Sequence, residues 1–208
     1  MAQVGAVHSV GESIVRHLSG AHAIERGVQA GLAEDRQTLP ACRFQQVSGT
    51  ELNNNFSPAE NLITFYLFRM GMDKNLRSTA DHKYPRDPKS RPLSLELHYL
   101  VSCWSASGMN EQTLMSWTML ELHRTALLDR AVLQPASLWE EDESVQLQLS
   151  EMNHESMMRI WDALQPDYRL SVSYVARTVR IETGVRSDAA PVVATRFGLQ
   201  KRSEDIDA

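Results

Sequence analysis

Residues 91–101 constrain the fold more than any other part of the sequence. Apolar and polar side chains alternate along them: Leu93, Leu95, Leu97, Tyr99 and Val101 share one parity, and Ser94, Glu96, His98 and Ser102 share the other. The side chains of a strand point alternately to its two faces, so this pattern predicts one apolar and one largely polar face. Pro92 suits the start of a strand, where a missing backbone N–H costs least. We therefore expect a central strand, around which the other elements are arranged.

The remaining periodicities predict both helices and strands. In chain order they indicate helices at 7–18, at 110–128 and within 150–164, and strands at 41–47, 62–69, 145–149 and 168–182. Residues 62–69 are apolar on both parities, which is typical of a strand covered on both faces. The predicted fold class is α/β (α+β): a mixed, mostly antiparallel sheet flanked by helices. We expect it to span residues 1–182, followed by an extended tail over 183–208.

Several local features leave alternatives open. Gly20 is expected to end the first helix, with residues 21–37 irregular. Asn110 is expected to cap the helix at 110–128, whose two apolar stripes pack either on its own sheet or partly on a neighbouring subunit. The apolar parity changes along 168–182, which requires a bulge or a change of packing partner.

Composition excludes several classes of function. A net charge of −5 gives no general basic surface, so nucleic acid is not an expected partner. Arg, Glu or His interrupts the longest apolar runs, which predicts no membrane span, and residues 1–5 lack a signal-peptide pattern. Cys42 and Cys103 form no CxxC pair and suit a reducing cytoplasm, with a single disulfide between them as the alternative.

No motif of an active site or cofactor site is present. Neither a phosphate-binding glycine loop nor a GxSxG elbow occurs. His98 and Cys103 are five positions apart, and the other candidate ligands, Cys42 and His82, complete no zinc spacing. The acidic run 140–143 lacks the glycine and the ligand spacing of an EF-hand. We predict no catalytic residues, no metal and no cofactor.

Three blocks carry a resemblance to a known family. Residues 92–100, PLSLELHYL, resemble the signature PLxLxLHYLL of the tail terminator, or cap, proteins of contractile injection systems, which are phage-tail-like particles. Residues 61–69, NLITFYLFR, followed by NLR at 75–77, resemble the block LNLYLYRV…NxxLRN. Residues 160–174, IWDALQPDYRLSVSY, resemble LWxALQxPYRLSVAY. The blocks follow the family's order over roughly 7–182 and resemble its N-terminal domain.

The resemblance implies a phage tail-terminator-like fold and a mechanical function. It implies a subunit of a ring, commonly a hexamer, that binds the terminal tube and sheath rings, stops their polymerisation and anchors the sheath. It also implies assembly in the bacterial cytoplasm, into a particle that is either released or retained. One alternative is an adaptor or baseplate component of the same particle. Another is a small enzyme with a site assembled from residues such as His98, Glu96 and Cys103.

The expected partner-binding residues fall into three groups. One is a basic segment formed by Lys74, Arg77, Lys83, Arg86, Lys89 and Arg91. The second is the acidic run of Glu140, Glu141, Asp142 and Glu143. In a head-to-tail ring these two segments would face each other, whereas both are simply solvated in the alternative interpretation. The third group comprises the apolar anchors of the tail, Val192, Val193, Phe197 and Leu199, which we expect to contact a neighbouring cap or sheath subunit.

Overall fold

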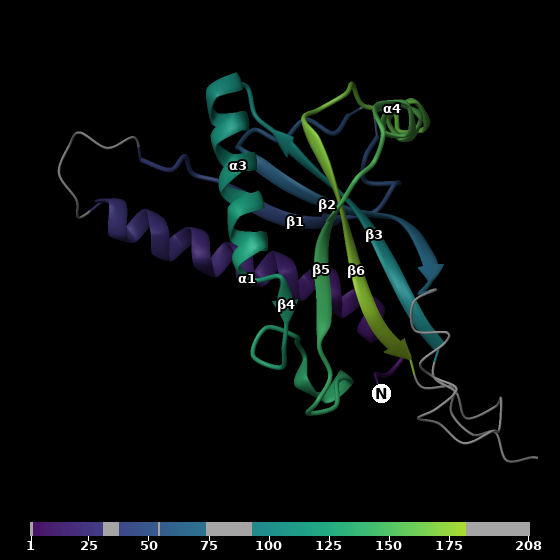
Figure 1. The fold of residues 1–208 in the computed structure, drawn as a ribbon. Coiled ribbons are helices and arrows are strands. Elements are labelled where there is room, and N and C mark those ends of the chain that lie inside the picture. The colour runs from purple at the N-terminus through teal and green to yellow at the C-terminus, as the bar shows by residue number, and fades with distance from the viewer. Residues whose placement is uncertain (1, 31–37, 54, 74–92, 182–208) are drawn as a thin grey trace, which may run out of the picture.

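The computed structural model describes residues 2–30, 38–53, 55–73 and 93–181. These residues form one twisted six-stranded sheet with helices on both faces (Figure 1). The helices are α1 (Ala6–Ala30), α3 (Gly108–Arg124) and α4 (His154–Ala163), with a short 3₁₀ turn, η2, at Ala136–Leu138. The strands are β1 (Arg43–Val47), β2 (Leu62–Met72), β3 (Leu93–Trp104), β4 (Leu127–Leu128), β5 (Val145–Ser150) and β6 (Ser171–Ile181).

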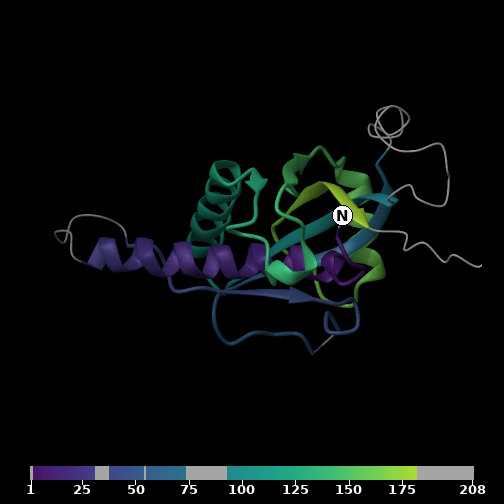
Figure 2. The same ribbon diagram turned by 90° about the horizontal axis from the view of Figure 1, so that it is seen from below.

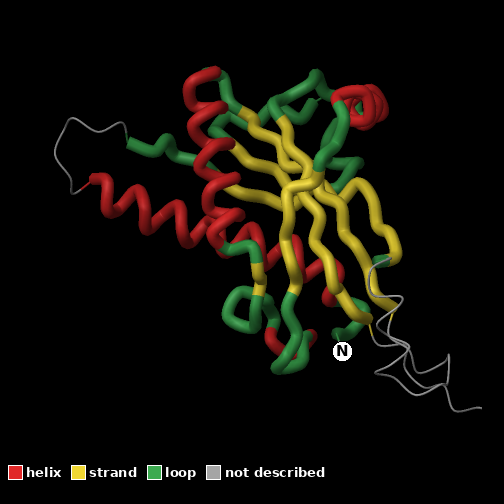
Figure 3. Tube along the Cα trace, viewed as in Figure 1, coloured by secondary structure: helices red, strands yellow, loops and turns green. Residues whose placement is uncertain are grey.

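Strand β3 lies in the interior of the sheet, as the sequence predicts. The order is β1-β2-β3-β6-β5-β4, and β3 pairs antiparallel with both of its neighbours. Only β1 and β2 are parallel, so the sheet is mixed and mostly antiparallel. Figure 3 shows the strands as one continuous layer. The predicted fold class is confirmed.

Helices α1 and α3 cover one face of the sheet, which holds the larger core. Val10, Ile14 and Leu18 recur at helical spacing on α1 and are fully buried. They pack with Leu97 and Tyr99 of β3 in one hydrophobic cluster, which also receives Leu114, Met115 and Leu122 of α3. These three residues of α3 therefore pack on the helix's own sheet, and a partial contact of its remaining apolar residues with a neighbouring subunit stays a prediction. In Figure 2, α1 runs between α3 and β1.

Helix α4 covers part of the opposite face. Its Trp161 is buried against Trp104 of β3, with ring centroids 6.0 Å apart. Leu52 and Phe56, from the segment between β1 and β2, complete this second cluster. Strands β2 and β3 are therefore covered on both faces near α4, as the two-sided apolar pattern of residues 62–69 predicts.

Two bulges sit on either side of β3. Between the pairs Leu95–Val179 and Leu97–Ala176, β6 has one more residue than β3, and Thr178 takes a positive φ of 66°. In the pairing of β2 with β3, the register also shifts by one residue, because Phe68 is an extra residue in β2. The change of apolar parity along residues 168–182 is therefore a bulge.

Several predicted boundaries are wrong. Helix α1 continues through Gly20 to Ala30, because residues 21–30 favour helix and His22 packs between the rings of Phe44 and Trp117. The cap of α3 is Ser107 rather than Asn110, since the Ser107 side chain accepts a hydrogen bond from the Asn110 N–H. Helix α3 ends at Arg124, and β2 extends three residues past the predicted end at residue 69.

Candidate assembly interface

The acidic run, residues 140–143, lies on a loop that is anchored to the first turns of α1. Trp139 is buried beside this loop and its indole N–H donates to the Ser9 hydroxyl at 3.0 Å. The backbone N–H of Gln134 donates to Ser13 Oγ at 2.9 Å. These contacts fix the position of the loop, on which Glu140, Glu141 and Asp142 are exposed.

The four acidic residues differ in their surroundings. Glu140, Glu141 and Asp142 are exposed, and Glu141 lies 3.6 Å from the guanidinium of Arg130. Glu143 is half-buried, and its carboxylate accepts the backbone N–H of Glu140 at 3.0 Å. The first three side chains therefore present negative charge to a partner, whereas Glu143 also shapes the turn.

The acidic run and the two flanks of the basic segment lie at the same end of the sheet. Strand β5 begins at Val145 directly after the acidic run, and the registers align that end with the end of β6, the start of β3 and the end of β2. The basic residues Lys74, Arg77, Lys83, Arg86, Lys89 and Arg91 lie outside the described residues. In the sheet, β6 and β3 lie between β5 and β2, and β6 alone lies between β5 and β3.

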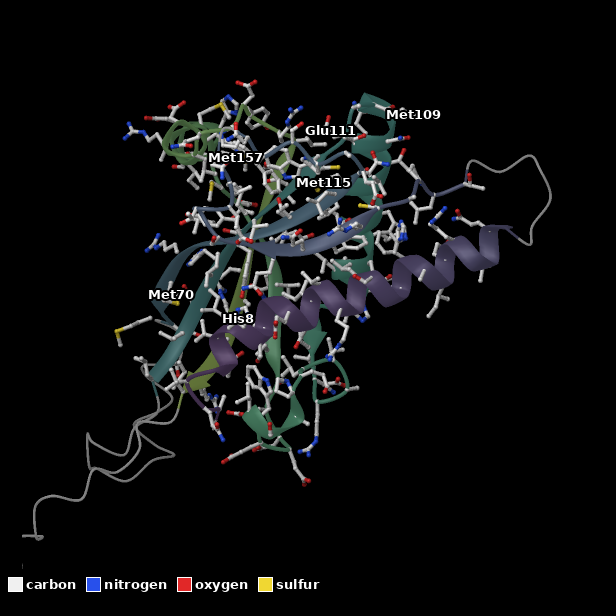
Figure 4. All side chains as sticks on the ribbon, turned by 180° about the vertical axis from the view of Figure 1, so that it is seen from behind. His8, Met70, Met109, Glu111, Met115 and Met157 are labelled. Atoms are coloured by element: carbon white, nitrogen blue, oxygen red, sulfur yellow. The ribbon has the colours of Figure 1, made fainter. Side chains whose placement is uncertain are left out.

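An apolar border also lies at this end of the sheet, and the sequence analysis missed it. Met70 and Met72 of β2 are 57% and 56% exposed, and Leu93 of β3 is 40% exposed. Figure 4 labels Met70 on this border, beyond the part of the sheet that α1 covers. The signal in the sequence is the spacing of the two methionines, which continues the strand alternation across Gly71.

A groove of about 540 Å³ separates α1 from the end of α3 and the loop at residues 131–132. His17 stands in it, with Nε2 3.0 Å from Glu121 Oε1 and 3.0 Å from Thr125 Oγ1. Ile24 is 71% exposed at the rim. The histidine is held by a carboxylate and a hydroxyl, an arrangement that ties the two helices together.

The residues of the alternative enzyme site do not converge. Glu96 and His98 lie on one face of β3, where Glu96 Oε1 is 3.2 Å from Arg177 Nε and Glu96 Oε2 is 3.7 Å from His98 Nε2. Burial, Arg69 and Arg177 lower the pKa of His98, while Glu96 opposes them. Cys103 belongs to the core on the opposite face. The Glu96 carboxylate therefore pairs with Arg177, and Cys103 is on the other face of the sheet.

The two thiols are unsuited to nucleophilic or redox chemistry. Burial raises the pKa of Cys42 and of Cys103 to about 12, so both stay protonated at neutral pH. Both are free cysteines, so the alternative of a disulfide between them is wrong. Across the described ranges, no three His, Cys, Asp or Glu side chains are placed to share a metal ion. In the same ranges no helix has the length and apolar character needed to cross a membrane.

The predicted tail anchors Val192, Val193, Phe197 and Leu199 also lie outside the described residues. The structure therefore assigns positions to the acidic run alone among the three predicted groups. What the described residues bring together is a charged loop, an apolar border and several strand ends at one end of the sheet.

A model of the Pvc16 N-terminal domain family matches residues 21–195. The match covers most of the chain, so the protein belongs to this family, and the resemblance to tail terminators of contractile injection systems is confirmed.

Two solved structures are similar at 18% sequence identity and a TM-score of 0.45. One is the sheath/tube terminator of an extracellular contractile injection system, PVC, in its extended state, solved by cryo-EM; the match covers 91% of this chain and 64% of that one. The other is the tube-terminating cap of the anti-feeding prophage, with 88% and 61% covered. The chain thus spans less than two thirds of the length of either. No curated protein matches the chain.

Proposed function

We propose that the protein is a structural terminator of a contractile injection particle and has no enzymatic activity. The observation that carries this proposal is membership of the Pvc16 N-terminal domain family over residues 21–195. In this proposal the protein covers the last tube and sheath rings, which otherwise grow by repeating one contact, and it anchors the sheath during contraction. It would be made in the bacterial cytoplasm and become part of the particle.

The proposed assembly is a hexameric ring with head-to-tail contacts. A cap matches the rotational symmetry of the tube that it covers, and a cyclic ring needs two different surfaces on each subunit. Support comes from the acidic run 140–143, which lies at the end of the sheet where β2 ends and β3 begins, the two flanks of the basic segment. Exposed charge pairs contribute only about 0–1 kcal/mol each, so they would steer assembly more than hold it.

We place the domain boundary near residue 182, with the tail at 183–208 serving as an extension that contacts a neighbour. Sequence supports this division, because apolar residues become sparse there and only Val192, Val193, Phe197 and Leu199 remain as anchors. Ordering such a segment costs about 1–2 kcal/mol per residue in backbone entropy. We therefore expect fast amide exchange of the tail in the isolated subunit and protection in the particle.

Deletion of the gene tests the proposed function. Without a terminator we expect sheaths of uncontrolled length, or particles that fail to mature, in electron micrographs. Restoring the gene should restore the length distribution. A normal distribution in the deletion strain would contradict the terminator function and favour an adaptor or baseplate component. The ring is tested separately by light scattering of the purified protein at micromolar concentration, where a strict monomer, alone and on tubes, would contradict it.

A further inference from the structure

Strand β2 extends well past its neighbour β1. The parallel pairing with β1 covers residues 62–66, whereas the pairing with β3 continues to Met72. Within the described residues, no strand therefore pairs with the outer border of β2 at residues 67–72. A strand edge of this kind presents unpaired backbone groups, which natural proteins usually protect.

The direction of these backbone groups follows from one hydrogen bond. The N–H of Asp73 donates to Ser94 O at 3.0 Å, so the backbone of Asp73 faces β3. The N–H and C=O of a strand residue face one edge, and successive residues alternate. Met72 and Met70 therefore direct their N–H and C=O groups to the outer border, where they can pair with an added strand.

The side chains at this border suit an apolar partner. Met70 pairs with Leu97 and Met72 with Leu95, so both methionines point to the face that holds the larger core. Both are more than half exposed. Methionine is flexible and polarizable, which allows it to adapt to a partner's side chains. Natural strand edges are often protected from pairing by charged residues or proline. Residues 67–72 contain one charged residue, Arg69, and no proline.

We propose that residues 68–72 of β2 accept an added strand, and that this strand is residues 191–199 of a neighbouring copy. The inference rests on the ring of the proposed function. Val193, Thr195, Phe197 and Leu199 alternate with smaller or polar residues, the pattern of a strand with one apolar row. That row would cover Met70 and Met72, while backbone hydrogen bonds would supply affinity.

The exit point of the chain allows this connection. Strand β6 ends at Ile181, which pairs with Leu93 at the same end of the sheet as Met72. Two strand spacings, about 10 Å, separate β6 from β2. Residues 182–190 reach up to about 30 Å when extended, enough to leave their own subunit. Each copy would then donate one tail and accept one tail, which is the heterologous contact that closes a ring.

Complementary variants of the full-length chain test the proposal. The edge variant, Met70→Lys with Met72→Lys, places charge on the border. The tail variant, Val193→Asp with Phe197→Asp, places charge in the apolar row. The matched control is Val28→Lys with Leu149→Lys, at residues elsewhere that are 56% and 54% exposed. Circular dichroism checks that each variant is folded, and light scattering gives its mass.

We expect each variant alone to lose the ring, while the control forms it as the wild type does. A mixture of the two variants should form dimers. The edge variant keeps an intact tail, which binds the intact edge of the tail variant, and the two altered surfaces that remain cannot bind a third chain. The proposal is overturned if either variant still forms rings, or if the mixture stays monomeric. A wild-type protein that forms no ring, or particles of normal length after gene deletion, would contradict the proposed function itself.

Discussion

The indole N–H of Trp139 donates a 3.0 Å hydrogen bond to Ser9 Oγ, although the two residues are 130 positions apart in the chain. Both side chains are buried, and the Ser9 hydroxyl in turn donates to Ala6 O at 3.0 Å. The bond joins the loop before the acidic run to the first turns of α1. The position of a surface loop in the proposed interface thus depends on a contact inside the core.

Replacing Ser9 with alanine tests the importance of this contact. The Trp139 indole would remain buried without an acceptor, so the free energy of unfolding should fall by roughly 1–3 kcal/mol. Urea unfolding measures this change. Ser19→Ala is the matched control, since Ser19 is exposed on the same helix and its hydroxyl donates to Val15 O. We expect the control to stay within about 0.5 kcal/mol of the wild type; equal losses in the two variants would contradict the interpretation.

The fold was predictable where one local pattern decides the structure. The alternation along residues 91–101 identifies an interior strand because a period of two fits no helix. Gly20 shows the opposite case. A glycine at this position suggests a helix end. The helix nevertheless continues, because His22 packs against Phe44 and Trp117. No contact requires glycine there, since nothing lies within 4 Å of the position that a Cβ would take. Contacts between distant segments decided that boundary, and no local pattern reports them.

Gly20→Ala should therefore stabilise the protein. Glycine in a helix interior is about 0.5–1 kcal/mol less favourable than alanine, and the added methyl group would meet open space. We expect the free energy of unfolding to rise by about that amount in urea titrations. Gly108→Ala, at the first position of α3, serves as comparison because helix-interior propensity does not apply there. An unchanged or lower stability of Gly20→Ala would contradict the continuous helix.

The candidate interface was predictable only in part. The run of four acidic residues indicates exposure, because unpaired carboxylates are costly to bury, and three of the four are exposed. The border at Met70 and Met72 was missed, because the apolar density of β2 falls at Arg69 and Gly71 suggests a turn. The bulge at Phe68 lets the strand continue beyond that point. A register shift of this kind depends on the neighbouring strand and has no signature in the sequence.

His22 makes stability depend on pH. Its ring is buried between Phe44 and Trp117, with centroids 5.5 Å and 5.2 Å away, and its Nε2 lies 2.9 Å from Pro40 O. Burial lowers the pKa of His22 below its ordinary value of 6.5; Arg26 adds to this effect and the Pro40 carbonyl opposes it. The unfolded chain therefore binds more protons than the folded one just below pH 6.5, so stability falls as the pH decreases through this range.

We expect the free energy of unfolding to decrease between pH 7.5 and pH 5.5, and His22→Gln to reduce that decrease. Glutamine retains a donor for the Pro40 carbonyl but does not titrate. His8→Gln is the control, because His8 is an exposed histidine on the same helix. Urea unfolding at the two pH values gives the comparison. A decrease of the same size in His22→Gln and the wild type would show that other groups cause it, such as His98, whose pKa is also lowered by burial.

Reversing the charge of the acidic run tests the proposed steering of ring assembly. The variant Glu140→Lys, Glu141→Lys and Asp142→Lys changes the three exposed side chains and leaves Glu143, whose carboxylate accepts the Glu140 N–H, in place. If these charges face the basic segment of a neighbour, the ring should form more slowly, and its rate should depend less on salt. Stopped-flow light scattering at low and high salt measures both effects.

The control for this experiment carries the same change in net charge at another place. Glu60, Glu151 and Asp162 are exposed and lie outside the acidic run, so their replacement by lysine changes the overall charge without touching the loop. Each exposed pair contributes at most about 1 kcal/mol, so the equilibrium mass of the ring should change little in either variant. The two variants should differ in rate because steering depends on where charge lies at the contact. Equal rates at low salt would mean that the acidic run is solvated in the ring and that its charge serves solubility rather than assembly.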